Sequence, residues 1–354
     1  MVVATVFVTT AGAAAAGAAA AATSTPPPGP SCLPPAYTAS ATSSLVTLDV
    51  VHSGTALDLA NVDVAPVAAS SALSSTPSQR PQSAAKATNL DVSLVNGLVR
   101  LDNELVSASQ NAPRDHPRPA TKTLFSLVPN EVLDTAVATA SAQARSVPGP
   151  PTAGLTVADA DSQLLNATAI NGTSLGTYLV GLENAEGGVV KSQADVALVP
   201  AYSASGGTLR SPEVRSQALT QLTGVTLLAG TAHAITVNVL APPSLTASAD
   251  GVAGSASVTY TEPVLQILQG NRVVGQLDAN TPSRSLTETD GQLSVSLSLG
   301  ILSHVTKSAS GTAAAGKAYL LNVDVTVGAI TVADLTIAPQ TASVQLSDDF
   351  GYCR

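Results

Sequence analysis

The sequence is poor in charged and aromatic residues. Only 11% of its 354 residues are charged and only 3% are aromatic, with six Tyr, three Phe and no Trp. A coiled coil needs charged positions beside its apolar seam, so this composition argues against one. A highly charged disordered chain is also excluded, because 45% of the residues are hydrophobic. The composition favours a folded chain whose surface carries little charge.

Basic residues are too few and too scattered to bind nucleic acid. The chain has 15 Lys and Arg against 24 Asp and Glu, a net charge of −9. Neutralising phosphates needs a basic stripe. The one basic cluster, formed by Arg114, Arg118 and Lys122, is interrupted by prolines and is typical of an extended loop. We predict no nucleic-acid partner.

The N-terminal 22 residues contain no charge and end in an Ala-rich run. This pattern is typical of a secretory signal peptide, cleaved near residues 20–22. Signal peptides begin with Lys or Arg, but the first basic residue here is Arg80, so we expect the natural start to lie upstream. An Ala-rich head on a cytosolic protein is the alternative. We predict a secreted or cell-surface protein with no stable membrane span after cleavage.

The chain has only two cysteines, Cys32 and Cys353. An even cysteine count in an exported protein favours pairing. We therefore predict a Cys32–Cys353 disulfide that joins the two ends. Lipidation of Cys32 is disfavoured by the residues before it, and two cysteines with no nearby His are a weak metal site.

Apolar residues recur with period two, which indicates strands with one buried face. The clearest case is residues 292–299, where Leu and Val alternate with Ser or Gln. Residues 45–50, 90–95, 235–240 and 320–327 resemble it, and Asn96-Gly97 predicts a tight hairpin turn. Two stretches, 130–145 and 211–221, carry helix-start signals but also alternate acceptably, and we predict strands there. The expected fold class is all-β, with one or two antiparallel β-sandwich-like units built from hairpins.

Two segments of the chain resemble each other. Residues 45–70 and 320–343 each contain two strand-like runs, then Ala-Pro, then an Ala- and Ser-rich segment. Residues 234–249 share parts of this pattern. We interpret the unit as a hairpin, a proline break and a third strand of small residues, because Pro suits a strand end or edge. Chance similarity in an Ala-, Thr- and Val-rich chain is the alternative.

Proline and glycine clusters divide the chain. We predict a signal peptide at 1–22 and a Pro-rich tether at 23–36. Two β-rich domains are expected at 37–147 and 155–354, joined by a Pro/Gly linker at 148–154.

Catalytic and metal-binding motifs are weak. Residues 172–176 match G-x-S-x-G and make Ser174 a remote hydrolase candidate, but the flanks lack the strand–helix alternation that this motif requires. Asp159 and Asp161 resemble the start of a calcium loop, whose later ligand positions are not filled. Acidic residues favour hard cations, so Asp159 and Asp161 are candidates for a loose cation site on the surface. We predict no catalytic residues, no metal site and no cofactor.

Several segments, including residues 260–282 and 293–300, resemble those of exported actinobacterial β-rich proteins of unknown function. The resemblance extends over most of the chain after Ala36. It implies a signal peptide and an all-β envelope or extracellular protein, although the basic start of the signal is missing. It assigns no functional residue.

Together these features predict an exported, non-enzymatic structural or interaction protein, whose partners would be cell-wall or other envelope components. The second hypothesis is a β module that binds a glycan or a small ligand, although few aromatic residues are present for stacking on sugars. The third is a serine hydrolase that uses Ser174.

Overall fold

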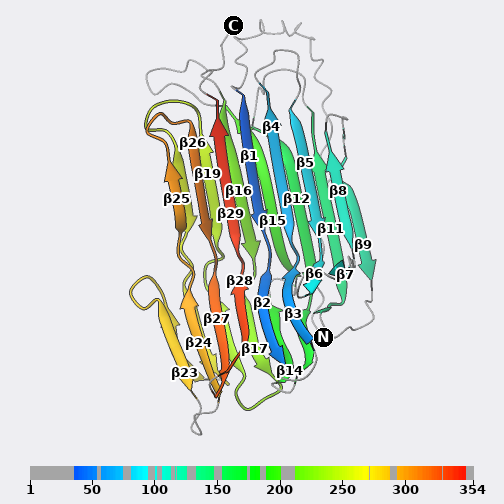
Figure 1. The fold of residues 1–354 in the computed structure, drawn as a ribbon, viewed down its shortest axis with the longest axis vertical. Helices are drawn as coiled ribbons and strands as arrows, with labels where there is room; N and C mark the ends of the chain where they lie inside the picture. The colour runs from blue at the N-terminus through cyan, green and yellow to red at the C-terminus, as the bar shows by residue number, and fades with distance from the viewer. Residues whose placement is uncertain are drawn as a thin grey trace, which may run out of the picture.

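The structure is a computed structural model, and β-strands are its regular elements (Figure 1). It describes residues 36–53, 57–74, 81–94, 100–101, 106–112, 116, 118–125, 133–146, 154–173, 176–183, 189–200, 212–270, 272–287, 293–328 and 330–347. The predicted all-β class with antiparallel sheets is confirmed. Within these ranges no helix has the length and apolar character needed to cross a membrane.

Four sheets form a front and a back layer, each with an upper and a lower sheet in the view of Figure 1. The front upper sheet contains, in order, β25 (Ser303–Lys307), β26 (Ala313–Ala318), β29 (Gln340–Leu346), β1 (Tyr37–Ser43), β4 (Val67–Leu73), β5 (Gln82–Thr88) and β8 (Ser107–Asn111). The front lower sheet contains β23 (Ser283–Thr287), β24 (Leu293–Leu299), β27 (Leu321–Val327), β28 (Ile330–Ile337), β2 (Val46–Ser53), β3 (Leu57–Val64), β6 (Leu90–Leu94) and β7 (Arg100–Leu101).

The back layer repeats this division. Its upper sheet contains, in order, β20 (Ser257–Thr261), β19 (Ser244–Ala249), β16 (Glu213–Gln221), β15 (Val189–Val199), β12 (Leu155–Leu165), β11 (Val137–Ala144) and β9 (Ala120–Phe125). Its lower sheet contains β10 (Leu133–Asp134), β13 (Ala167–Thr173), β14 (Gly176–Glu183), β17 (Gly224–Ala229), β18 (Ile235–Val239), β21 (Leu265–Gln269) and β22 (Arg272–Leu277).

The chain runs as a meander of long arms, most of which consist of an upper and a lower strand separated by a short break. β1 continues into β2, for example, and β3 into β4. Within each layer, arms that follow each other in sequence pair side by side, and the chain passes between the layers from β8 to β9 and from β22 to β23. The first and last arms pair through β1 with β29 and β2 with β28. β11 pairs with β12 across residues 148–154, and strands from both sides of this segment share the back upper sheet.

The upper half of the molecule has an interior of small side chains. Along β11 every second residue is a fully buried alanine, and Ala, Ser and Gly fill most inward positions of β5, β16 and β26. Cα atoms of facing strands, such as β1 and β16, come within 8 Å of each other. Sheets that pack through larger side chains lie about 10 Å apart. We call this part the alanine half.

The lower half has an interior of Leu, Val and Ile. Inward positions include Leu297, Val323 and Leu335 in front, and Leu227, Val237 and Ile267 at the back, all fully buried. Facing strands here do not approach as closely along their length in the described part of the chain. We call this part the leucine half. The same arms therefore pass through a thin interior and a thick one.

Most local predictions from the sequence are confirmed. β24 buries Val295, Leu297 and Leu299 and turns Ser outward. β6 pairs with β7 through Val92 with Leu101 and Ser93 with Arg100, as the Asn96-Gly97 hairpin requires, although the turn itself lies outside the described residues. The two similar segments form β2–β3–β4 and β27–β28–β29, with Pro66 and Pro339 at the breaks.

The close approach of the sheets in the alanine half makes it intolerant of larger side chains. Ala85 points inward and is 2% exposed, whereas its neighbour Ala84 lies on the outer face. We expect Ala85→Leu to lower the free energy of unfolding by about 1–3 kcal/mol, because overpacking forces the two layers apart. Ala84→Leu is the matched control and should change it by less than about 0.5 kcal/mol. Urea unfolding of both variants tests this, and equal effects would contradict tight packing between the layers.

Candidate functional site

The breaks in the front layer change the alternation of side chains. In a regular strand every second side chain points outward. In the arms of β5–β6, β3–β4, β1–β2, β28–β29 and β26–β27, outward residues on either side of the break are five positions apart. The four residues between them are buried or half-buried. The outer surface therefore loses side chains along a band that crosses five arms.

Strand pairing aligns the outward residues into two rows. The upper row is Lys86, Ala68, Thr42, Thr341 and Lys317. The lower row is Asp91, Asp63, Thr47, Thr336 and Asn322. We call the band between these two rows the furrow. It runs across the strands, and its walls belong to different sheets.

The backbone in the floor of the furrow stays hydrogen-bonded to its neighbours. Ser44 N–H donates to the Pro339 carbonyl at 3.2 Å, and Thr88 N–H donates to the Pro66 carbonyl at 3.0 Å. Ala65 and Ala338 adopt positive φ angles of 54° and 51°. This left-handed conformation costs a non-glycine residue about 1–2 kcal/mol and breaks the regular alternation of a strand. The furrow is thus built into the backbone of the two similar segments.

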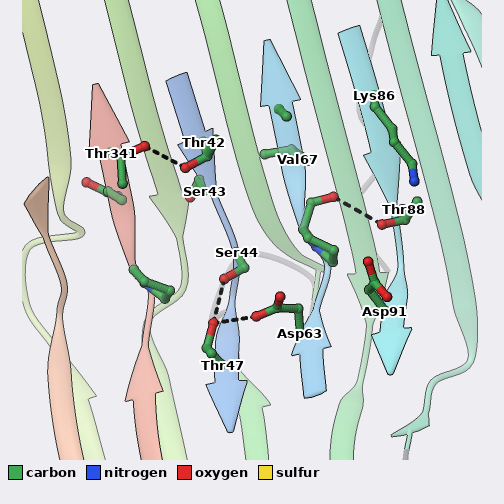
Figure 2. Close-up of a pocket in the computed structure, with 14 residues that line it drawn as sticks. Thr42, Ser43, Ser44, Thr47, Asp63, Val67, Lys86, Thr88, Asp91 and Thr341 are labelled. Atoms are coloured by element: carbon green, nitrogen blue, oxygen red, sulfur yellow. Dashed lines mark hydrogen bonds between the residues drawn. The ribbon is translucent and has the colours of Figure 1, made fainter. Parts of the chain in front are cut away.

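Part of the furrow is a hollow of about 450 Å³, lined by residues of β29, β1, β4 and β5 and of the adjoining β2, β3 and β6. Figure 2 shows hydroxyl groups on both walls of it. Thr42 and Thr341 share a hydrogen bond of 2.6 Å across two strands. On the opposite wall the Thr47 hydroxyl donates to an Asp63 carboxylate oxygen at 2.6 Å and lies 3.2 Å from the Ser44 hydroxyl. The walls of the hollow therefore present hydroxyl, carboxylate and ammonium groups, and Val67, Pro66 and Pro339 add apolar surface between them.

A buried polar layer beneath the furrow ties the front layer to the back. The Gln340 amide donates to the Thr220 hydroxyl at 3.1 Å and to the Pro243 carbonyl at 3.0 Å. The Ser43 hydroxyl also lies 3.1 Å from that of Thr220. These bonds hold the floor in place, because a buried polar group that loses its partner costs about 1–3 kcal/mol.

A second set of bonds ties the other end of the floor. The fully buried Asn89 amide donates to the Ser162 hydroxyl at 3.0 Å, and Ser162 donates to the Thr88 carbonyl at 2.8 Å. Both contacts cross the interior between β5–β6 and β12. The floor is therefore fixed from below at two places.

Sequence reasoning missed the furrow. Its walls come from five arms that pair only in the folded chain. Within each arm the two wall residues are five positions apart, a spacing that matches no recognised motif. The Ala-Pro pair at 65–66, repeated at 338–339, is the available signal, and from the sequence alone it indicates only a strand break.

Ser174 lies outside the described residues, but its neighbours are described. Thr173 and Gly176 pair with each other, so the G-x-S-x-G segment connects the two strands of an antiparallel hairpin, β13–β14. A nucleophile elbow connects a strand to a helix. The local architecture therefore differs from that of the hydrolases which use this motif.

Asp159 and Asp161 lie on the outer face of β12, in a strand rather than a loop. Asp161 forms an ion pair with Lys191, and the Gln163 amide donates to it at 2.8 Å. The Gln193 amide donates to Asp159 at 3.2 Å. Among the described residues no group of three or more His, Cys, Asp and Glu could hold a metal ion. The two carboxylates are engaged by neighbouring side chains of the same face.

Carboxyl groups face each other at several places on the outer faces. Asp159 pairs with Asp195, and Asp324 with Asp334. Burial raises the pKa of Asp195 to about 6, with Arg215 lowering it and Asp159 raising it further. Burial also raises the pKa of Asp159, and burial together with Asp334 raises that of Asp324. These groups bind protons more readily in the folded chain than in the unfolded one.

The raised pKa of Asp195 predicts a pH-dependent stability. Between the unfolded pKa of about 3.9 and the folded value of about 6, the folded state holds more protons, so stability falls as pH rises through this window. We expect Asp195→Asn to raise the thermal midpoint at pH 7.5 and to leave it unchanged at pH 4. Thermal unfolding at both pH values tests this.

Asp278 gives a matched control, because its pKa is shifted in the opposite direction. Hydrogen bonds from the backbone N–H groups of Thr281 and Asn280 lower the pKa of Asp278. Asp278→Asn should therefore lower the midpoint at pH 7.5. Equal effects of both substitutions at pH 7.5 would contradict the assignment of Asp195.

No protein-family model matches the chain, and no curated protein is significantly similar to it. We therefore infer its function from the furrow and from the organisation of the chain.

Proposed function

We propose that this protein is an exported, non-enzymatic structural and interaction protein of the cell envelope or extracellular space. The observation that carries this proposal is the furrow, an open band of hydroxyl, amide and charged side chains on a floor held by backbone and buried side-chain hydrogen bonds. A rigid surface with polar walls suits recognition of a partner from outside. The uncharged N-terminal segment supports export.

The position of the chain ends supports the Cys32–Cys353 disulfide as part of this proposal. Both cysteines lie outside the described residues. Tyr37 pairs with Leu346, however, and Ser347 N–H donates to the Ala36 carbonyl at 2.8 Å. Cys32 precedes Tyr37 by five residues, and Cys353 follows Leu346 by seven. Extended chain segments of these lengths reach about 17 Å and 23 Å. Closing so long a loop would stabilise the fold by up to about 5–6 kcal/mol.

The disulfide predicts a defined change in intact mass. Protein purified without reductant should gain about two hydrogens on reduction after denaturation, because each disulfide takes up two on becoming two thiols. A Cys32→Ser variant should show no intramolecular gain. A native chain whose mass does not change on reduction would overturn the pairing.

Export predicts where the protein is found and where it begins. We expect it in the culture medium or the cell-wall fraction of its source cells, with a mature chain that starts near residue 23. A cytosolic enzyme measured in the same fractions controls for lysis. An uncleaved chain confined to the cytosol would overturn the proposal.

A further inference from the structure

The furrow has the chemistry of a binding site for a polyhydroxylated ligand. Its walls offer hydroxyls from Thr42, Thr341, Thr47 and Thr336. Thr47 and Thr336 already donate their protons to Asp63 and Asn322, so they meet a ligand as acceptors. The bonded pair of Thr42 and Thr341 keeps one hydroxyl proton to donate. Carboxylate, amide and ammonium groups of the same two rows extend this set. Sugars present hydroxyls at close intervals. Walls that carry both donors and acceptors can hydrogen-bond to such hydroxyls along the length of the furrow.

The backbone of the furrow is not available to a peptide strand. Peptides that add to a sheet use the unpaired N–H and C=O groups of an edge strand. β1, β4 and β29 are interior strands with partners on both sides, and floor residues such as Ser44 and Thr88 donate their N–H groups to neighbouring arms. Recognition in the furrow therefore depends on side chains.

The dimensions suit a chain that lies across the strands. Wall residues five positions apart are separated by at most about 16 Å along a strand, since each residue rises about 3.3 Å. The length of the furrow is set by five adjacent arms spaced about 4.8 Å apart. Pro66 and Pro339 lie half-buried in its floor and supply rigid rings between the polar walls.

The charges of the walls favour a neutral ligand. The two rows contain Lys86 and Lys317 against Asp63 and Asp91, so their formal charges cancel. The chain as a whole carries −9, which disfavours the approach of a polyanion. An acidic polymer would meet this field with no basic surplus in the furrow to offset it.

We infer that the furrow binds a neutral glycan chain that lies across the strands of the front layer. This inference rests on the proposed function as an interaction protein, for which it names the ligand class and the site. Thr42 and Thr47 bind sugar hydroxyls from opposite walls, and Asp63 and Lys86 orient the ligand at one end of the hollow.

Titration of the full exported chain with defined hexasaccharides tests the inference. The neutral probes are cellohexaose and chitohexaose, the acidic probe is hexagalacturonate, and binding is followed by calorimetry and by the NMR signals of Thr methyl groups. We expect a neutral probe to bind, with affinity insensitive to salt. The Thr42→Val and Thr47→Val double variant should weaken binding about tenfold or more, since each lost hydrogen bond contributes about 1 kcal/mol.

Thr38→Val is the matched control, because Thr38 is exposed on the same face of β1 but outside the furrow. It should bind like the native chain, and unchanged thermal midpoints show that the valine variants fold. Salt-sensitive binding of hexagalacturonate alone would overturn the inference, as would an equal loss of affinity in Thr38→Val. Failure of all three probes to bind a chain that is found outside the cell would overturn the glycan site and leave the proposed function standing.

Discussion

The two interiors of this protein differ in thickness, and the rest of the structure depends on this difference. Alanine and serine hold the upper sheets close, whereas Leu, Val and Ile hold the lower sheets apart. Both interiors lie along the same arms. A regular strand cannot follow both spacings without a change in direction, so the arms break where the two halves meet. Ala65 and Ala338, whose backbones adopt the left-handed conformation, lie at two of these breaks.

The breaks have different consequences on the two sides of the front layer. Inside, the close approach of the sheets lets Gln340 and Asn89 reach partners on the back layer, which gives a polar layer between two apolar interiors. On the outer face, four successive residues in each of the five arms have buried or half-buried side chains, and this gap between outward side chains is the furrow. The furrow and the polar layer therefore have one cause, and a change that alters the break should affect both.

Local order was predictable from the sequence because it depends on neighbours. Alternation of Ser with Leu and Val in β24, and the Asn96-Gly97 turn, act over a few residues. The furrow was not predictable, because its walls form only when β1 pairs with β29, whose sequences lie at opposite ends of the chain. Asp159 and Asp161 also show this limit. Their spacing resembles the start of a calcium loop whose later ligand positions are not filled, but pairing of β12 with β15 places Lys191 beside Asp161.

A rigid floor makes the furrow a better binding surface than its hydroxyl content alone suggests. Ordering loops and side chains on binding costs about 0.5–1.5 kcal/mol for each flexible side chain. The walls consist largely of short Thr and Asp side chains, and several are already bonded to each other, as Thr42 is to Thr341 and Thr47 to Asp63. A ligand that meets these groups in place loses little affinity to ordering. A site built this way compensates for scarce aromatic residues with many short, prepositioned hydrogen-bonding groups.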